Sequence, residues 1–222
     1  MAKILILLGP PGSGKGTQAK LLIQRKEGVA HISTGDLFRS EIASASELGK
    51  LVEETIRKGS LVSDEITNQI FYKQINLLHI KNPTNKVYIL DGYPRTAPQA
   101  DFLRKMSLSE DSFFEGLLVA ELDVSEDEVI RRISGRLINP RLGIVYHKTD
   151  KTPKKEGFCD EDGGELIQRE DDNPKTVRER YEIYRTEVDG IVTQLGTSKE
   201  FYKIEAMRPP EEVYSELSKL LK

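Results

Sequence analysis

The chain has 222 residues, enough for one large domain with insertions, and carries a formal net charge of −3 with 31% charged residues. This balance provides no basic field for nucleic acid, so a nucleic-acid-handling ATPase is disfavoured. The one cysteine, Cys159, excludes an internal disulfide framework and indicates a reducing compartment.

The chain begins with a short apolar run that stops at Leu8, followed by glycine and proline. The run is too short for a signal peptide or a bilayer span, so we expect a cytoplasmic protein without a membrane partner. Strands are predicted over 3–8, 29–32, 87–90, 116–122 and 200–204. Helices are predicted over 15–24, 35–44, 47–58, 64–79, 97–106, 126–134, 174–195 and 210–221. This alternation predicts an α/β fold with a doubly wound, mostly parallel five-stranded sheet.

The first motif follows the first predicted strand, where residues 9–17 read Gly-Pro-Pro-Gly-Ser-Gly-Lys-Gly-Thr. Glycines let backbone N–H groups wrap an anion, and the following helix directs its positive end at the same place. Lys15 then reaches the outer phosphates, and Thr17 offers a hydroxyl to a phosphate or Mg²⁺. Gly16 stands where Ser or Thr usually follows the lysine. The strand–glycine–helix order favours a phosphate loop over an ordinary turn.

Two further motifs end predicted strands. The segment HISTGDLFR contains Thr34, which is compatible with a simple helix cap, and Arg39, one turn into the helix. The segment LDGYPRT places Asp91 at a strand end, where doubly wound sheets bind ligands, with Arg95 close behind. The Asp91 carboxylate can orient a water molecule bound to Mg²⁺, and the Arg95 guanidinium can donate two parallel hydrogen bonds to a phosphate. The alternative is a strand-ending turn with a surface arginine.

A long stretch, 136–172, is rich in Gly, Pro, Lys and acidic residues, and its β-like pieces at 144–147 and 165–167 predict a small insert that folds on itself. Five arginines flank it: Arg132, Arg136, Arg169, Arg178 and Arg180. Arg132 and Arg136 are four residues apart, which predicts one shared helix face. The alternative is that these arginines are solvated surface charges. For Arg169, a further alternative is pairing with the acidic residues 170–172.

Five segments carry a family resemblance over nearly the whole length of the chain: GPPGSGKGTQA, HISTGDLFR, LDGYPRT, SGRLINPRLGIVYH and ELIQREDDNPKTVRERYEIY. The family that they resemble is adenylate kinase. The resemblance implies a P-loop core over 1–32, 63–134 and 173–222. It also implies a small helical monophosphate-binding insert over 33–62 and a lid insert over 135–172. The implied reaction is reversible and Mg²⁺-dependent, converting ATP and AMP into two ADP by direct transfer in a closed site.

The resemblance also implies site residues. The implied catalytic residues are Lys15, Arg95, Arg132, Arg136, Arg169 and Arg180. The implied ATP-binding residues are Gly12, Ser13, Gly14, Lys15, Gly16, Thr17, Arg132, Arg136, Val145, Tyr146 and Arg208, the last through its backbone. The implied AMP-binding residues are Thr34, Arg39, Ser60, Leu61, Val62, Gly92, Arg95, Gln99, Arg169 and Arg180. Mg²⁺ is expected on the nucleotide phosphates and water near Thr17 and Asp91.

The sequence departs from the family pattern at two places. Many bacterial relatives hold the lid with zinc, and the matching positions here are Asn139, Leu142, Cys159 and Asp162. Leucine cannot ligate and amide oxygens are poor zinc ligands, so we expect no structural zinc. Apolar packing of Leu137, Ile138, Leu142, Ile144 and Phe158, with hydrogen bonds, is expected instead. Near the expected adenine contact, Ala206 has less backbone conformational freedom than the glycine that often stands there in the family.

Two rival functions remain open at this stage. One is a sibling kinase that acts on UMP or CMP or takes GTP as donor, although Gln99 and Thr34 favour adenine by resemblance. The other is a non-catalytic nucleotide-binding module, which the retained Lys15, Asp91 and Arg95 disfavour. A monomer is expected by family analogy.

Overall fold

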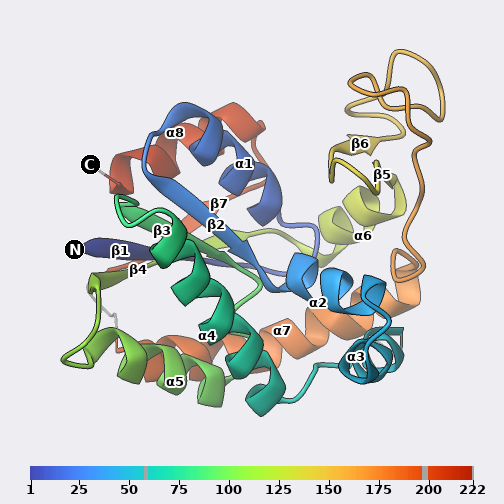
Figure 1. Cartoon of the computed structure of the whole chain (residues 1–222). Helices are drawn as coiled ribbons and strands as arrows, with labels where there is room; N and C mark the ends of the chain where they lie inside the picture. The colour runs from blue at the N-terminus through green and yellow to red at the C-terminus, as the bar shows by residue number, and fades with distance from the viewer. Residues whose placement is uncertain (58–59, 197–199, 222) are drawn as a thin grey trace.

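The computed structural model describes residues 1–57, 60–196 and 200–221 (Figure 1). Its strands are β1 (Ala2–Leu8), β2 (Val29–Ser33), β3 (Val87–Asp91), β4 (Phe114–Asp123), β5 (Arg136–Ile138), β6 (Val145–His147) and β7 (Phe201–Glu205). Its helices are α1 (Lys15–Arg25), α2 (Thr34–Ala43), α3 (Glu47–Arg57), α4 (Asp64–Lys81), α5 (Ala97–Leu108), α6 (Glu126–Ser134), α7 (Pro174–Leu195) and α8 (Pro210–Leu220). No helix in these ranges is both long and apolar enough to cross a membrane.

A five-stranded sheet with the order β2-β3-β1-β4-β7 forms the centre, and every neighbouring pair is parallel. The predicted fold class is therefore confirmed. The predicted elements match the observed ones to within two residues at each end, and the predicted end of α3, Lys58, lies outside the described residues. The sequence did not indicate β5, which pairs antiparallel with β6.

Alternating residues of β1 build the two layers around the sheet. Ile4 and Ile6 are buried against α4, α5 and α7, whereas Leu5 and Leu7 are buried against α1, α6 and α8. A strand buried on both faces must be apolar throughout, which explains the uninterrupted hydrophobic run at the start of the chain. The central position of β1 fixes where the glycine loop leaves the sheet.

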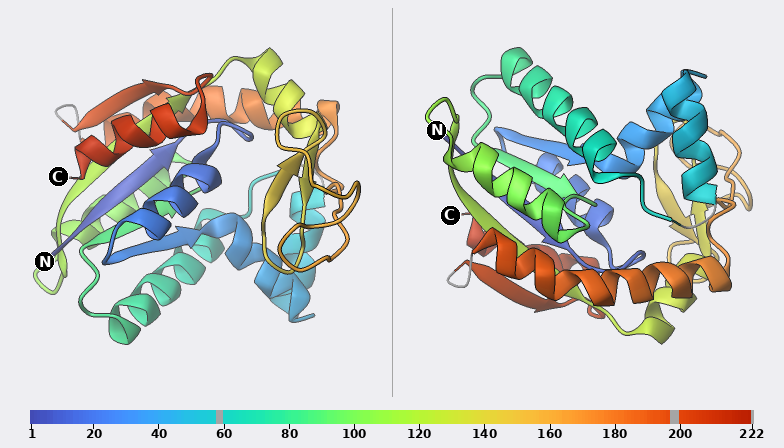
Figure 2. Two further views of the ribbon diagram at one scale, coloured as in Figure 1. Left: turned by 90° about the horizontal axis from the view of Figure 1, so that it is seen from above. Right: turned by 90° about the horizontal axis from the view of Figure 1, so that it is seen from below.

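Two smaller parts stand beyond the carboxyl ends of the strands (Figures 1 and 2). The first, residues 33–62, contains α2 and α3 around a small core of Phe38, Val52 and Val62. The second, residues 135–172, contains β5 and β6 and is closed by isolated bridges rather than by a strand at 165–167. Both lie at the end of the sheet where parallel α/β folds bind ligands.

Gly49 sets the distance between α2 and α3. A Cβ built at this position would lie 2.3 Å from the carbonyl oxygen of Glu41 and 3.2 Å from Cα of Ile42. Backbone atoms cannot swing aside as a flexible side chain can, so the two helices depend on glycine at this point.

We predict that Gly49→Ala pushes α3 away from α2 and destabilises the 33–62 part by about 1–3 kcal/mol. Hydrogen exchange of the α2 and α3 amides measures the effect and should be at least about tenfold faster than in the wild type. Gly116→Ala is the matched control, because a Cβ there would meet no described heavy atom within 4 Å outside its chain neighbours. Unchanged exchange in Gly49→Ala would contradict the prediction.

Candidate active site

The loop between β1 and α1 is built on three glycines with positive φ, Gly9 at 144°, Gly12 at 77° and Gly14 at 102°. Gly14 caps α1, so the helix starts at Lys15 with its positive end facing the loop. The Lys15 Nζ donates hydrogen bonds of 2.8 Å to the carbonyl oxygens of Gly9 and Pro10. The ammonium therefore lies inside the loop, and backbone carbonyls surround it as anionic oxygens would.

Burial lowers the pKa of Lys15 to about 8. The carboxylate of Asp91 acts in the opposite direction, whereas the positive charges of Arg95, Arg180 and Arg136 lower the pKa further. Positive charge is thus concentrated around the glycine loop, which is the property of a site that binds anions.

Asp91 ends β3 beside this loop. Burial acts to raise its pKa, but the neighbouring His31, Lys15 and Arg95 outweigh burial, so the net pKa lies below the usual value. His31 Nε2 is 3.6 Å from Asp91 Oδ2. A Cβ at Gly16 would lie 3.4 Å from the same oxygen, so glycine after Lys15 leaves the carboxylate room next to α1.

The turn after β3 fixes the direction of Arg95. The carbonyl oxygen of Gly92 accepts hydrogen bonds from Arg95 Nε at 2.8 Å and from Thr34 Oγ1 at 2.7 Å. Gly92 has a φ of 78°, and a Cβ there would lie 2.9 Å from both side chains. The Gly92 turn therefore ties the start of α2 to the loop that carries Arg95.

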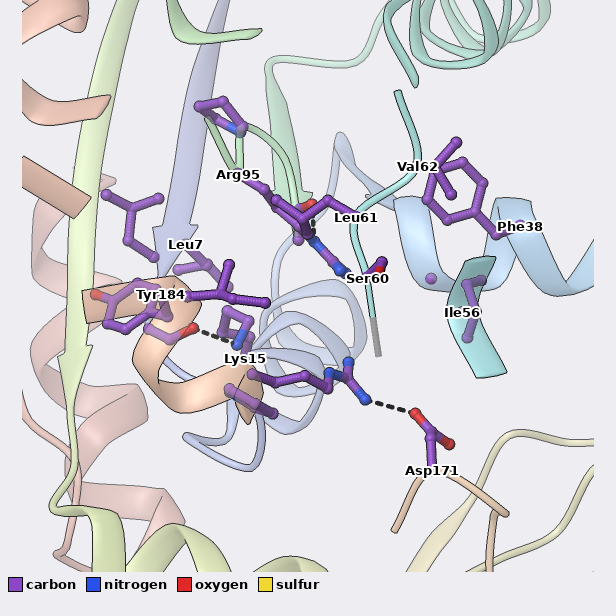
Figure 3. A pocket seen from close by; sticks show the side chains of 18 of the residues that line it. Leu7, Lys15, Phe38, Ile56, Ser60, Leu61, Val62, Arg95, Asp171 and Tyr184 are labelled. Carbon is purple, nitrogen blue, oxygen red and sulfur yellow. Dashed lines mark hydrogen bonds and ion pairs between the residues drawn. The ribbon is translucent and has the colours of Figure 1, made fainter. Parts of the chain in front are cut away.

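These segments line one cavity of about 1010 Å³ that includes open solvent (Figure 3). Lys15 and Arg95 point into it, and Asp171 lies at its edge. Its predicted site residues are Lys15, Arg39, Ser60, Leu61, Val62, Gly92, Arg95 and Arg180. A small adjoining pocket adds Thr34 and Gln99, with Phe38 and Thr67 in its wall. The predicted acceptor-side residues are thus brought together, with Arg169 outside these two cavity walls.

The arginines around the cavity fall into two groups. Arg136 pairs with Asp172 through both carboxylate oxygens, Arg180 pairs with Asp171, and Arg39 pairs with Asp36. Arg95 and Arg169 form no salt bridge within the described residues. Burial, together with neighbouring arginines, lowers the pKa of each of these two to about 10.

The structure corrects the expected common helix face of Arg132 and Arg136. Helix α6 ends at Ser134, so Arg136 belongs to β5 instead. Arg132 is held on α6 by Glu128 at 2.7 Å and by the carbonyl oxygen of Ala206 at 2.8 Å. Arg178, the remaining flanking arginine, lies 3.5 Å from Glu126.

Of the predicted ATP-side residues, only Lys15 lines these two cavities. Thr17 is exposed at the start of α1, and Val145 is exposed on β6. Arg208 binds Glu216 at 2.5 Å and the carbonyl oxygen of Glu205 at 3.1 Å. Gly12, Ser13 and Gly14 form the loop itself, and the buried Ser13 approaches Lys15 Nζ at 3.3 Å.

The ring of Tyr146 lies inside the 135–172 part rather than on its surface. It packs with Cys159 and Leu166, and its hydroxyl accepts a hydrogen bond of 2.9 Å from the backbone N–H of Asp160. The Tyr146 ring is therefore not available to contact a ligand. The expected apolar set is partly wrong: Ile138 is buried and Leu137 and Ile144 pack on this core, whereas Leu142 and Phe158 are 41% and 38% exposed.

A hydrogen bond joins Asn139 and Asp162, two of the four positions at which we expect no zinc. Asn139 is 1% exposed, donates to Asp162 at 2.6 Å and accepts from the backbone N–H groups of Arg141 and Leu142 at 2.9 Å. Asp162 also binds the Arg141 guanidinium, which lowers the pKa of that carboxyl. No group of three or more metal-binding side chains occurs among residues 1–57, 60–196 and 200–221. The expectation of a zinc-free insert remains a prediction.

Sequence patterns do not single out several residues that shape the site. In the sequence, Asp171 and Asp172 are only acidic neighbours of Arg169, yet in the structure they pair with Arg180 and Arg136. Tyr184 lines the cavity and donates a 2.6 Å hydrogen bond to the buried Glu121. Two adjacent acidic residues in a segment flanked by several arginines could have indicated these ion pairs, because buried cations need acceptors.

Comparisons with known proteins agree with this geometry. The family described as Adenylate kinase matches residues 7–200. A protein named Adenylate kinase from Anaeromyxobacter dehalogenans (strain 2CP-C) is 42% identical over 98% of this chain and 99% of its own length. Others with that name include one from Streptomyces avermitilis, 42% identical over 94% of this chain and 92% of its own, and one from Thermotoga neapolitana, 38% identical over 100% and 98%.

We predict that Asn139→Ala loosens the 135–172 part, because it leaves two backbone N–H groups and Asp162 without their buried partner. Amide exchange across this part should accelerate at least about tenfold. Arg141→Ala is the control, since the Arg141 side chain is 72% exposed and its pairing contributes little. Equal acceleration in both variants would place the stability of this part elsewhere.

Proposed function

The chain belongs to the adenylate kinase family, and we propose that its clustered cations carry out reversible Mg²⁺-dependent transfer of a phosphoryl group from ATP to AMP, giving two ADP. The observation that carries this proposal is the convergence of Lys15, Arg95 and Arg180 on one cavity beside the glycine loop. Burial, followed by the neighbouring arginines, lowers the pKa values of Lys15 and Arg95, as expected for cations gathered in one buried site.

On the donor side, we assign the ATP phosphates to the loop from Gly12 to Thr17. Backbone N–H groups and the start of α1 favour an anion there, and Lys15 exchanges the carbonyls of Gly9 and Pro10 for phosphate oxygens. The backbone of Val145, Tyr146 and Arg208 is assigned to the nucleoside portion of ATP.

On the acceptor side, we assign the AMP phosphate to Arg39, Arg95, Arg169 and Arg180. Arg95 and Arg169 form no salt bridge among the described residues, so neither must give up a carboxylate to bind the phosphate. Thr34, Gly92, Gln99 and residues 60–62 are assigned to the nucleoside, because they line the cavity or the small pocket beside it.

The transfer itself needs charge and alignment more than covalent help from the protein. The transferred phosphoryl is loosely bonded in the transition state, so fixed cations stabilise it and in-line positioning accounts for much of the rate. The proposed cations are Lys15, Arg95, Arg132, Arg136, Arg169 and Arg180. Arg132 and Arg136 must exchange protein acceptors for phosphate oxygens as the site closes.

Water competes with AMP as the phosphoryl acceptor, so the site must exclude it. We propose that the 135–172 part is the lid that does so and that the 33–62 part closes over AMP. Lys20 Nζ on α1 already donates a hydrogen bond to the carbonyl oxygen of Gly143 in the proposed lid. This contact gives the lid a place to rest on the core.

The residues near the loop suit Mg²⁺ carried by the nucleotide. Asp91 keeps a charged carboxylate at the end of β3, and oxygen ligands and ordered water are what Mg²⁺ prefers. Asp91 and the Thr17 hydroxyl would hold its water shell. Bound there, Mg²⁺ neutralises part of the negative charge on the phosphates.

The rival functions are not favoured by the comparisons, since the relatives are named Adenylate kinase rather than a UMP/CMP or GTP:AMP kinase. A non-catalytic module is disfavoured by the convergence of cations on the cavity. Action as a cytoplasmic monomer, without nucleic-acid or membrane partners, stays a prediction.

We predict that Lys15→Ala and Arg95→Ala each reduce turnover with ATP and AMP by at least about a hundredfold, because each removes a fixed cation from the transferring phosphoryl. A coupled ADP-formation assay measures turnover, and circular dichroism checks the fold. Arg104→Ala on α5 is the control, since Arg104 pairs with Asp101 outside the cavity. Near-normal turnover in Arg95→Ala would remove Arg95 from the site.

We also predict that kcat/KM for Mg·ATP declines as pH rises above about 8, where the free protein loses the Lys15 charge. The sign follows from the lowered pKa: the charged form that attracts phosphate is complete only well below that value, whereas the ATP phosphates are already ionised. Measurements from about pH 6.5 to about pH 10 test this, with the decline approaching tenfold per pH unit. A flat profile to about pH 9.5 would contradict it.

A further inference from the structure

The side-chain amide of Gln99 is held from both ends. The backbone N–H of Arg95 donates to Gln99 Oε1 at 2.8 Å, and Gln99 Nε2 donates to Asp64 Oδ1 at 2.7 Å. Gln99 is 1% exposed and lies in the wall of the small pocket beside the proposed AMP phosphate site.

These two partners determine which end of the amide is oxygen and which is nitrogen. A backbone N–H only donates and an ionised carboxylate only accepts. A flipped amide would place an N–H group against the N–H of Arg95 and an oxygen against Asp64. Because the site is buried, such a mismatch leaves unpaired polar groups that water cannot satisfy.

Asp64 is itself held in place. It lies in the first turn of α4, and its Oδ1 accepts a second hydrogen bond, of 2.8 Å, from Thr96 Oγ1. Thr96 caps α5 by accepting from the backbone N–H of Gln99 at 3.3 Å. Asp64 therefore joins α4 to the start of α5, behind the wall of the pocket.

The fixed amide has limited capacity left for a ligand. Its nitrogen keeps one hydrogen and its oxygen keeps one lone pair, and their order cannot be reversed. Adenine offers a ring nitrogen that accepts beside an amino group that donates. Hypoxanthine and guanine offer the opposite arrangement, an N–H that donates beside a carbonyl that accepts. An amide free to rotate would pair with either kind of purine.

We propose that Asp64 is a specificity-determining positioning residue: by fixing the Gln99 amide it makes the acceptor pocket select 6-aminopurine over 6-oxopurine monophosphates. This inference rests on the proposed function, since it assumes that Gln99 faces the base of the acceptor nucleotide. Asp64 itself is not in the wall of the small pocket, so it acts through Gln99.

The test compares kcat/KM for AMP and for inosine monophosphate (IMP), with Mg·ATP as donor, in the wild type, Asp64→Asn and Asp64→Ala. IMP differs from AMP at the purine 6-position and the adjoining N1 proton. The ratio of the two constants is independent of the fraction of folded enzyme. Glu65→Gln is the matched control. This substitution removes the same charge from the same turn of α4, but the Glu65 side chain is exposed.

We expect the AMP-to-IMP ratio to fall at least about tenfold in both Asp64 variants, with the KM for ATP unchanged, because the group that can only accept is lost. Asparagine at this position can pair with either end of the Gln99 amide, and alanine can pair with neither. Glu65→Gln should keep the ratio within about twofold of the wild type. Ratios within about twofold of the wild type in both Asp64 variants would overturn the proposal. A wild-type chain inactive with AMP would instead overturn the proposed function, and this inference with it.

Discussion

The gathering of buried positive charge at one end of the sheet is the constraint on which the site depends. Burial and mutual repulsion lower the pKa values of Lys15, Arg95 and Arg169, so these cations cannot be packed together at no cost. The protein reduces that cost with its own acceptors, such as the loop carbonyls around Lys15 and the carboxylate of Asp171 beside Arg180. Phosphates must replace these acceptors, so nucleotide binding and rearrangement of the site are energetically coupled in the proposed mechanism.

The sheet explains how residues far apart in sequence reach one place. In a parallel sheet with β1 at its centre, the loops after β1 and β3 emerge at the same edge, and they carry the glycine loop and Arg95. The 33–62 and 135–172 parts stand beyond that edge, each with a small core of its own. Small separate cores suit parts that are proposed to move, because each keeps its shape while its contacts with the sheet change.

Polar groups behind the cavity walls add a second level of control. Asp64 accepts a hydrogen bond from Gln99, Asp172 from Arg136, and Glu121 from Tyr184. Each pairing fixes the direction of a group near the cavity. A buried hydrogen bond of this kind contributes modestly to stability, but breaking one leaves an unsatisfied partner. Such residues are therefore expected to govern which ligand fits and how it is aligned.

The sequence by itself determined the fold class, the bounds of most elements to within two residues, and the glycine loop with Lys15, Asp91 and Arg95. These are local signals: apolar runs, glycines and helix caps act over a few neighbouring residues. Only the tertiary structure decided that Arg136 lies on β5, that Tyr146 is buried and that Asp64 holds Gln99. Asp64 and Gln99 are 35 residues apart, and Arg136 and Asp172 are 36 apart. Which acceptor meets which donor across such a separation depends on chain packing, and no local periodicity records it.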